Sequence, residues 1–151
     1  MKIASFILPL ISLSLVAFVA HLLWEASHVS LYTGYEGLSP TFPIHVWAAI
    51  GDVLYTLGIY FVVALFKKDV LWLRRVTVLD LVTLALVGFV LAVGIEWKAL
   101  FFERWAYLPS MPIIPLLEVG LSPILQMVIL LPFSVYVAGR LFKVSCKEGL
   151  E

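Results

Sequence analysis

The sequence predicts an all-α integral membrane protein, a four-helix bundle with both termini in the cytoplasm. The chain has 151 residues, of which 63% are hydrophobic and only 13% charged, whereas a soluble domain carries about 25% charged residues. Its mean hydropathy is +1.08. Apolar stretches of the length that crosses a bilayer, about 20 residues, recur along the chain. Helices satisfy every backbone polar group internally, so in lipid these stretches are expected to be helical.

The apolar stretches define four predicted spans within a single transmembrane domain, residues 1–151. The first covers residues 3–24, and its helical pattern is able to continue to Tyr32. We interpret it as an uncleaved span, because cleavage after Ala20 would place bulky Phe18 where a signal peptide needs a small residue. The second, third and fourth spans cover residues 44–66, 76–97 and 116–137.

The basic residues orient these spans. Eight of the ten lysines and arginines fall on one predicted side of the bilayer, namely Lys2, Lys67, Lys68, Arg74, Arg75, Arg140, Lys143 and Lys147. Cytoplasmic segments carry such an excess of positive charge. We therefore expect both termini and the 67–75 connector in the cytoplasm, and the protein in a bacterial or archaeal cytoplasmic membrane.

Charge and cysteine content restrict the possible partners. The formal net charge is zero and the chain has no basic block, so nucleic acid is not an expected partner. The only cysteine, Cys146, excludes an internal disulfide and a cysteine-based metal site. The expected partners are the lipid bilayer and a lipophilic small molecule, and assembly into a homo- or hetero-oligomer stays open. The sequence indicates no particular cofactor.

Ionisable residues inside two of the predicted spans indicate a site. His21, Glu25 and His28 follow one another at spacings of four and three, which places them on one helical face. His45 and Asp52 are seven residues apart and again share a face, which Tyr55 continues. A charged group at mid-bilayer costs roughly 2.5–3.5 kcal/mol on insertion scales, so such residues mark functional sites by default.

Further polar and aromatic residues lie toward the same, extracytoplasmic ends of the spans. Glu96 closes the third span and Glu118 opens the fourth, while Gln126 lies deeper. An alternative for Glu96 is a structural ion pair with Lys98 or Arg104 that docks the third connector. Aromatic residues at these depths are typical of an interfacial belt. The full set of expected ligand-binding residues is Trp24, His28, Tyr55, Glu96, Trp97, Arg104, Trp105, Tyr107, Glu118 and Gln126.

Three kinds of function remain open at this point. The leading one is a polar intramembrane pocket that binds a lipophilic or isoprenoid-like molecule and transfers a proton to or from it. Asp52 and Glu25 are then the candidate acid and base, with His21 and His45 as their partners. Burial in an apolar pocket favours the protonated form of a carboxyl group, which can then act as an acid.

The two alternatives use the same residues differently. Imidazole and carboxylate groups bind zinc, iron, copper or haem, so His21, His28 and His45 are candidate metal ligands. Glu25 and His28 have the Glu-x-x-His spacing of di-iron helical bundles, although the chain holds only one copy. The third possibility is a non-catalytic subunit of a membrane complex.

A sequence pattern in the second half resembles known membrane proteins. It comprises Glu96-Trp97, Arg104-Trp105-Ala106-Tyr107, Met111-Pro112-x-x-Pro115 and Gly120-Leu121-x-Pro123-x-x-Gln126. With Trp24-Glu25 and Gly51-Asp52, it resembles a group of small bacterial four-span membrane proteins, which implies a fold but no particular activity. It is also similar to carotenoid-pathway membrane proteins such as lycopene cyclase small subunits, whose paired Pro-x-Glu-Glu motif this chain lacks. The architecture is similar in outline to the sterol isomerase and sigma-2 receptor superfamily.

Overall fold

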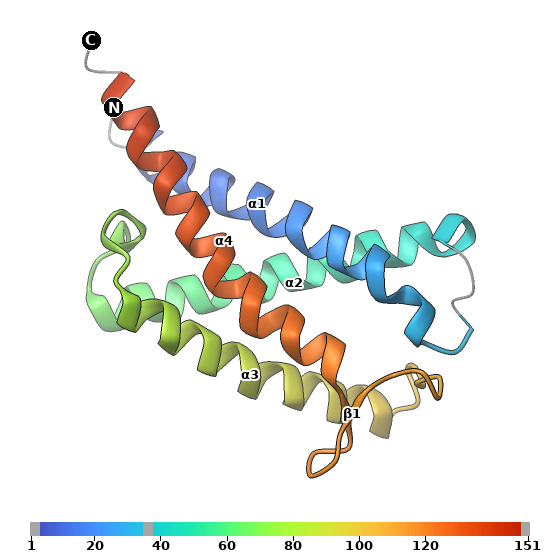
Figure 1. The fold of residues 1–151 in the computed structure, drawn as a ribbon. Helices are drawn as coiled ribbons and strands as arrows, with labels where there is room; N and C mark the ends of the chain where they lie inside the picture. The colour runs from blue at the N-terminus through green and yellow to red at the C-terminus, as the bar shows by residue number, and fades with distance from the viewer. Residues whose placement is uncertain (1–3, 35–37, 149–151) are drawn as a thin grey trace.

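A computed structural model describes residues 4–34 and 38–148, with side chains for 7–34 and 42–142, and confirms the predicted all-α four-helix bundle (Figure 1). The described residues hold four long helices: α1 (Ala4–His28), α2 (Leu38–Lys67), α3 (Val78–Phe101) and α4 (Leu121–Glu148). Each is long and apolar enough to cross a membrane, which indicates an integral membrane protein. Lys2 and Ile3 lie outside the described residues, as do the side chains of Lys143, Cys146 and Lys147.

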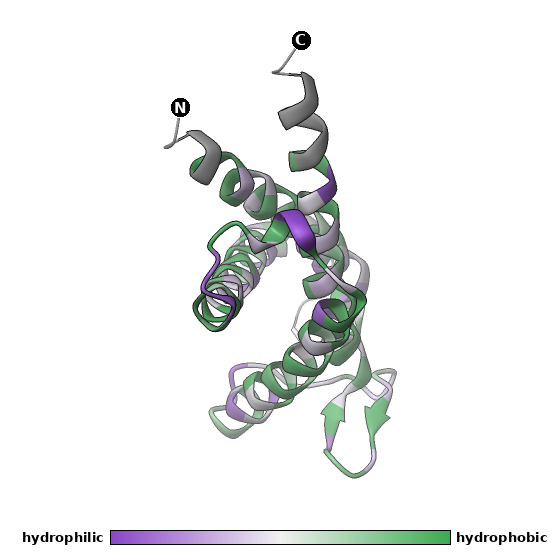
Figure 2. Ribbon diagram, turned by 90° about the vertical axis from the view of Figure 1, so that its left-hand side faces the viewer, coloured by the Kyte–Doolittle hydropathy of each residue, from purple (hydrophilic) through white to green (hydrophobic). Residues whose placement is uncertain are grey.

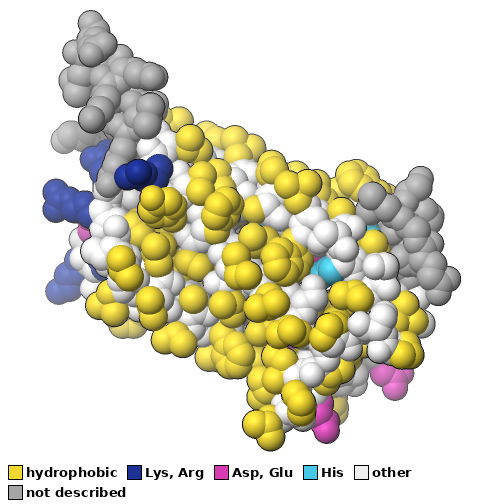
Figure 3. Space-filling model, in the orientation of Figure 1, with side chains coloured by type: hydrophobic (Ala, Val, Ile, Leu, Met, Phe, Trp, Pro, Cys, Tyr) yellow, Lys and Arg dark blue, Asp and Glu magenta, His cyan; other side chains and the backbone are white. Residues whose placement is uncertain are grey.

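The two ends of the bundle differ in charge. The α2–α3 connector contains a short 3-10 helix, η2 (Trp72–Arg75), and lies at the end where α1 begins and α4 terminates (Figure 1). We call this the basic end, because Lys67, Lys68, Arg74, Arg75 and Arg140 lie there (Figure 3). The opposite end, where the 102–120 segment joins α3 to α4, is called the loop end. The excess of positive charge predicts that the basic end faces the cytoplasm.

Polar contacts at the basic end fix where α3 begins. The Thr77 hydroxyl accepts a hydrogen bond from the Asp80 backbone N–H, and the Asp80 carboxylate accepts one from the Thr77 N–H, which forms a capping box. Lys67 Nζ lies 2.7 Å from Asp80 Oδ1, so the end of α2 is paired with the start of α3. This pairing anchors α2 and α3 to each other at the basic end.

The loop end differs from the sequence prediction. The fourth span is predicted to begin at Leu116, but α4 begins at Leu121, and the residues before it form a small antiparallel hairpin. Its strands are β1 (Ile113–Ile114) and β2 (Val119–Gly120). Glu118 in the turn has a φ of 55°, in the left-handed region that no helix uses. The hairpin closes with a hydrogen bond of 2.7 Å from the Leu121 N–H to the Pro112 carbonyl.

The helices pack in the spatial order α2, α1, α4, α3. The main apolar core lies toward the basic end and includes Tyr60, Trp72 and Leu131. Hydrophobic residues dominate the four helices (Figure 2), and apolar side chains cover much of the face seen in Figure 3. Phe66 and Val90 are 85% and 70% exposed. An apolar outer surface of this extent suits contact with lipid rather than water. A second, smaller apolar cluster near the loop end includes Val93, Ile124 and Met127.

Gly88 sets the closest approach between α3 and α4. A Cβ atom placed on it would lie 2.7 Å from the Met127 carbonyl oxygen, which belongs to helix backbone and cannot move aside. We predict that Gly88→Ala destabilises the bundle by about 1–3 kcal/mol through overpacking. Gly94→Ala is the matched control, because it changes the same helix where nothing lies within 4 Å.

The measurement is the unfolding free energy of both variants in bicelles. The Gly94→Ala variant should match the parent protein or gain up to about 1 kcal/mol from its better helix propensity. Equal stability of the Gly88→Ala and Gly94→Ala variants would contradict the close α3–α4 contact.

Candidate functional site

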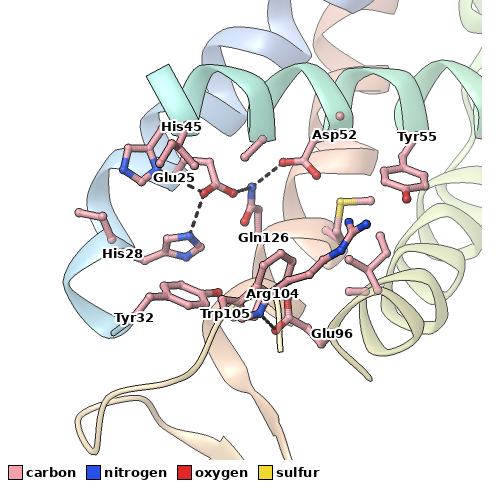
Figure 4. Close-up of a pocket in the computed structure, with 18 residues that line it drawn as sticks. Glu25, His28, Tyr32, His45, Asp52, Tyr55, Glu96, Arg104, Trp105 and Gln126 are labelled. Atoms are coloured by element: carbon pink, nitrogen blue, oxygen red, sulfur yellow. Dashed lines mark hydrogen bonds and ion pairs between the residues drawn. The ribbon is translucent and has the colours of Figure 1, made fainter. Parts of the chain in front are cut away.

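A cavity of about 320 Å³ lies in the half of the bundle toward the loop end (Figure 4). This volume is within the range of small-molecule sites, about 300–1,000 Å³. All four long helices and the 102–120 segment contribute to its wall. The lining residues are Glu25, His28, Val29, Tyr32, Ile44, His45, Ala48, Gly51, Asp52, Tyr55, Ala92, Ile95, Glu96, Arg104, Trp105, Pro123, Gln126 and Met127.

The amide of Gln126 on α4 lies at the centre of the polar wall. Its nitrogen Nε2 donates to Glu25 Oε1 of α1 and to Asp52 Oδ2 of α2, both at 3.0 Å. The same nitrogen lies 3.1 Å from His21 Nδ1. Gln126 is 3% exposed, so these bonds form away from bulk water. One amide thereby joins α1, α2 and α4, and it holds two carboxyl groups beside each other.

The number of hydrogens on that amide assigns the state of His21. A primary amide has two N–H donors, and Glu25 and Asp52 use both. His21 Nδ1 also lies 3.2 Å from Asp52 Oδ2. If His21 carries its hydrogen on Nδ1, it donates to Asp52, and its approach to Gln126 Nε2 is then a contact between two donors and not a hydrogen bond. The ring is fully buried, and its Nε2 atom finds no hydrogen-bond partner among the described residues.

Glu25 has a second set of partners on its other oxygen. His28 Nε2 lies 3.3 Å from Glu25 Oε2, and His45 Nδ1 lies 3.9 Å from the same oxygen (Figure 4). On its other side, His28 Nδ1 lies 2.8 Å from the hydroxyl of Ser122 in the first turn of α4. These bonds are all satisfied when Nε2 of His28 donates to Glu25 and Nδ1 accepts from Ser122. The polar network therefore extends from Asp52 through Gln126 and Glu25 to the loop end.

Glu96 docks the 102–120 segment, though not by the ion pair considered from the sequence. Its Oε2 atom accepts hydrogen bonds from Trp105 Nε1, at 3.2 Å, and from the Tyr107 hydroxyl. Within the described residues, no ion pair joins Glu96 to Lys98 or Arg104. Uncharged aromatic donors hold this buried carboxyl group because the segment turns Trp105 and Tyr107 toward α3.

The same segment is also fastened to the end of α1. The Thr33 N–H donates to the Ala106 carbonyl and the Leu108 N–H to the Leu31 carbonyl, both at 2.9 Å. The ring of Tyr32 lies edge-on to that of Trp105. Burial raises the pKa of Tyr32, and the negative charge of Glu96 adds to that shift. Burial, followed by the hydrogen bond to Glu96, raises the pKa of Tyr107. Both phenols therefore keep their protons at neutral pH.

The structure brings most, but not all, of the predicted site residues together. Glu25, His28, His45, Asp52, Tyr55, Glu96, Arg104, Trp105 and Gln126 line the cavity. His21 lies behind Asp52, and Tyr107 lies behind Glu96. Both residues therefore position a carboxyl group instead of facing the cavity.

Besides His21 and Tyr107, three more predicted residues lie outside the cavity lining. Glu118 is exposed in the hairpin turn, because the fourth helix begins after it and not before it. Trp97 is 52% exposed, and its Nε1 donates to the Leu117 carbonyl at 2.8 Å, so it fastens the hairpin to α3. Trp24 is partly buried away from the cavity, and its indole N–H has no partner among the described residues.

Several lining residues were not predicted from the sequence. Tyr32 follows His28 by four residues, and Ala48 and Gly51 share the helical face of His45, Asp52 and Tyr55. Extending the first face by one turn would have found Tyr32, and including the small residues between His45 and Tyr55 would have found the other two. Ala92, Ile95 and Met127 carry no polar signal, so only the packing of α3 against α4 reveals them.

The arrangement of the described side chains gives no support to the runner-up prediction, a metal site of His21, His28 and His45. Among the described residues, no group of three or more histidine, cysteine, aspartate or glutamate side chains could hold a metal ion. Here His21 pairs with Asp52, whereas His28 and His45 lie beside Glu25. The Nδ1 atoms of His21 and His45 and both ring nitrogens of His28 have partners within the network.

Comparison with known proteins adds no family to this description: no family model matches the chain, and no curated protein or solved structure matches it significantly.

Proposed function

We propose that the protein binds a lipophilic, isoprenoid-like molecule in this cavity and catalyses a proton transfer on it. The protein would do so in the cytoplasmic membrane of a bacterium or archaeon. The observation that carries the proposal is the position of two carboxyl groups, Glu25 and Asp52, on one cavity wall inside apolar helices. Intramembrane ionisable residues that face a cavity are costly, and proteins keep them for function.

The remaining lining residues support a lipophilic ligand. Ile44, Ala48 and Gly51 form the α2 side of the cavity, and Ala92 and Ile95 form the α3 side. Ligand sites combine an apolar wall of this kind with a few converging polar groups that fix orientation. The tryptophan and tyrosines at the rim, Trp105, Tyr32 and Tyr55, present aromatic faces to the same space. Such faces stabilise a developing positive charge.

Asp52 and Glu25 share Gln126 as a donor but lie beside different histidines. Asp52 receives hydrogen bonds from His21 and Gln126, and Glu25 receives them from Gln126 and His28. In a double-bond shift, Asp52 adds a proton to one alkene carbon, and Glu25 removes a proton from the allylic carbon attached to the other alkene carbon. The double bond then lies between these last two carbons. Atoms and electrons balance without any co-reactant, and the ligand leaves as an isomer. A positioned acid or base of this type contributes about 10²–10⁴-fold in rate.

Filling the cavity tests the binding part of the proposal. Gly51 lines the cavity, and a Cβ atom placed on it would meet nothing within 4 Å, so Gly51→Trp puts an indole in the ligand space without a backbone clash. Gly58→Trp is the matched control, because it lies on the same helix and is equally open, but does not line the cavity.

Lipids extracted from each purified protein are compared by mass spectrometry. A lipophilic molecule should be present with the parent and Gly58→Trp proteins and lost from Gly51→Trp. Identical lipid profiles for all three proteins would contradict binding in this cavity.

Replacing the candidate acid tests the proton transfer. The purified protein with its extracted-lipid complement is incubated in D₂O, and deuterium on carbon in those lipids is measured. We expect incorporation with the parent protein and a rate reduced by about 100-fold or more in Asp52→Asn. Asp69→Asn makes the same change at an exposed position near the basic end, and it should behave as the parent. Undiminished incorporation in Asp52→Asn would remove Asp52 from the chemistry.

A further inference from the structure

The cavity lies between α2 and α3, the two helices of the bundle that are not packed along each other within the described residues. Neighbouring helices pack in the pairs α2–α1, α1–α4 and α4–α3, but within the described residues α2 and α3 do not pack along each other. They are joined at the basic end, by the connector and the Lys67–Asp80 pair, and diverge toward the loop end (Figure 1). Both helices line the cavity, which lies in the part where they are apart. The cavity is therefore bordered by two helices that are not packed along each other at this depth.

The carboxyl groups in the cavity already have donors from the protein. Glu25 is bonded to Gln126 and His28. Asp52 is bonded to Gln126 and paired with His21, while Glu96 accepts from Trp105 and Tyr107. A cationic ligand would have to compete with these donors. The number of acidic residues in the cavity is therefore not by itself a reason to expect a positively charged ligand.

Arg104 is in the opposite situation. Its side chain reaches into the cavity toward Tyr55 (Figure 4), and it also lines an adjoining pocket that contains Thr33, Glu103 and Ala106. Within the described residues, its guanidinium group makes no hydrogen bond or ion pair. A guanidinium carries five N–H donors in a planar fork that matches carboxylate and phosphate groups. Arg104 is exposed, so these donors face solvent and are available to an anionic group on a ligand in the cavity that Arg104 lines.

We propose that the ligand is an amphiphile with an anionic head group, a carboxylate or a phosphate, which Arg104 binds. Its hydrocarbon chain lies in the cavity against Ala48, Gly51 and Ile95, and it leaves between α2 and α3 into the bilayer. This inference rests on the proposed function, because it names the class of lipophilic molecule that the cavity takes. The predicted orientation places the head group toward the extracytoplasmic leaflet.

The test uses three photo-crosslinking probes with the same long chain and chain-borne diazirine: a fatty acid, its methyl ester, and the corresponding amine. The protein is reconstituted in phosphatidylcholine nanodiscs, and labelled peptides are identified by mass spectrometry. The fatty acid should label cavity residues of α2 and α3, and it should do so about tenfold more than the ester, since a charge-assisted bond to arginine is lost in the ester.

Variants show whether Arg104 supplies this preference. Arg104→Gln should reduce labelling by the fatty acid about tenfold and leave labelling by the ester unchanged. Lys98→Gln is the matched control, because it removes the other described cation near the loop end, which does not line the cavity. Its labelling should equal that of the parent. Thermal unfolding of both variants confirms that the bundle is intact.

Each other outcome has a definite meaning. Equal labelling of the cavity by acid and ester, unaffected by Arg104→Gln, would overturn the anionic head group but leave the lipophilic cavity of the proposed function standing. Stronger labelling by the amine would overturn the proposal in favour of a cationic ligand. Displacement of the fatty acid by inorganic phosphate at equal concentration would assign the site to a free anion. Failure of every probe to label the cavity would count against the proposed function as well.

Discussion

The hydrogen bonds of the Gln126 amide are the interaction on which the loop-end half of the bundle depends. They join a residue of α4 to carboxyl groups on α1 and α2, each of which also lies beside a histidine. A buried polar group without a partner costs about 1–3 kcal/mol, and a charged one costs more. The amide is the one donor that the two carboxyl groups share, so it links them to each other on the cavity wall.

The two halves of the molecule follow different physical rules. Toward the basic end, large apolar side chains such as Trp72 and Leu131 fill the space between helices, and glycines such as Gly139 allow the η2 segment to approach α4 closely. Toward the loop end, a smaller apolar cluster that includes Val93, Val119 and Met127 joins α3, α4 and the hairpin. Beside it lies the hydrogen-bonded network, and Glu96 fastens the 102–120 segment to α3.

The sequence predicts much of this arrangement because it rests on regular periodicity. Hydropathy locates the helices, and the spacing of His21, Glu25 and His28 places them on one face, as the structure has them. The start of α4 is less accessible to such reasoning, since Leu116 and Leu117 look like helix until the hairpin bonds of their neighbours are known. The role of Gln126 could not be predicted either. Its three partners are separated from it by 74 to 105 residues, and only the tertiary packing brings them together.

The most direct test of the Gln126 network is the unfolding free energy of Gln126→Leu in bicelles, compared with Ser134→Ala. Both changes remove a buried polar group from α4, but the Ser134 hydroxyl has no hydrogen-bond partner among the described residues. We predict that Gln126→Leu costs about 1–2 kcal/mol, because Glu25 and Asp52 lose a shared donor inside the membrane, while Ser134→Ala is nearly neutral. Equal stability of the two variants would contradict the central role of the Gln126 amide.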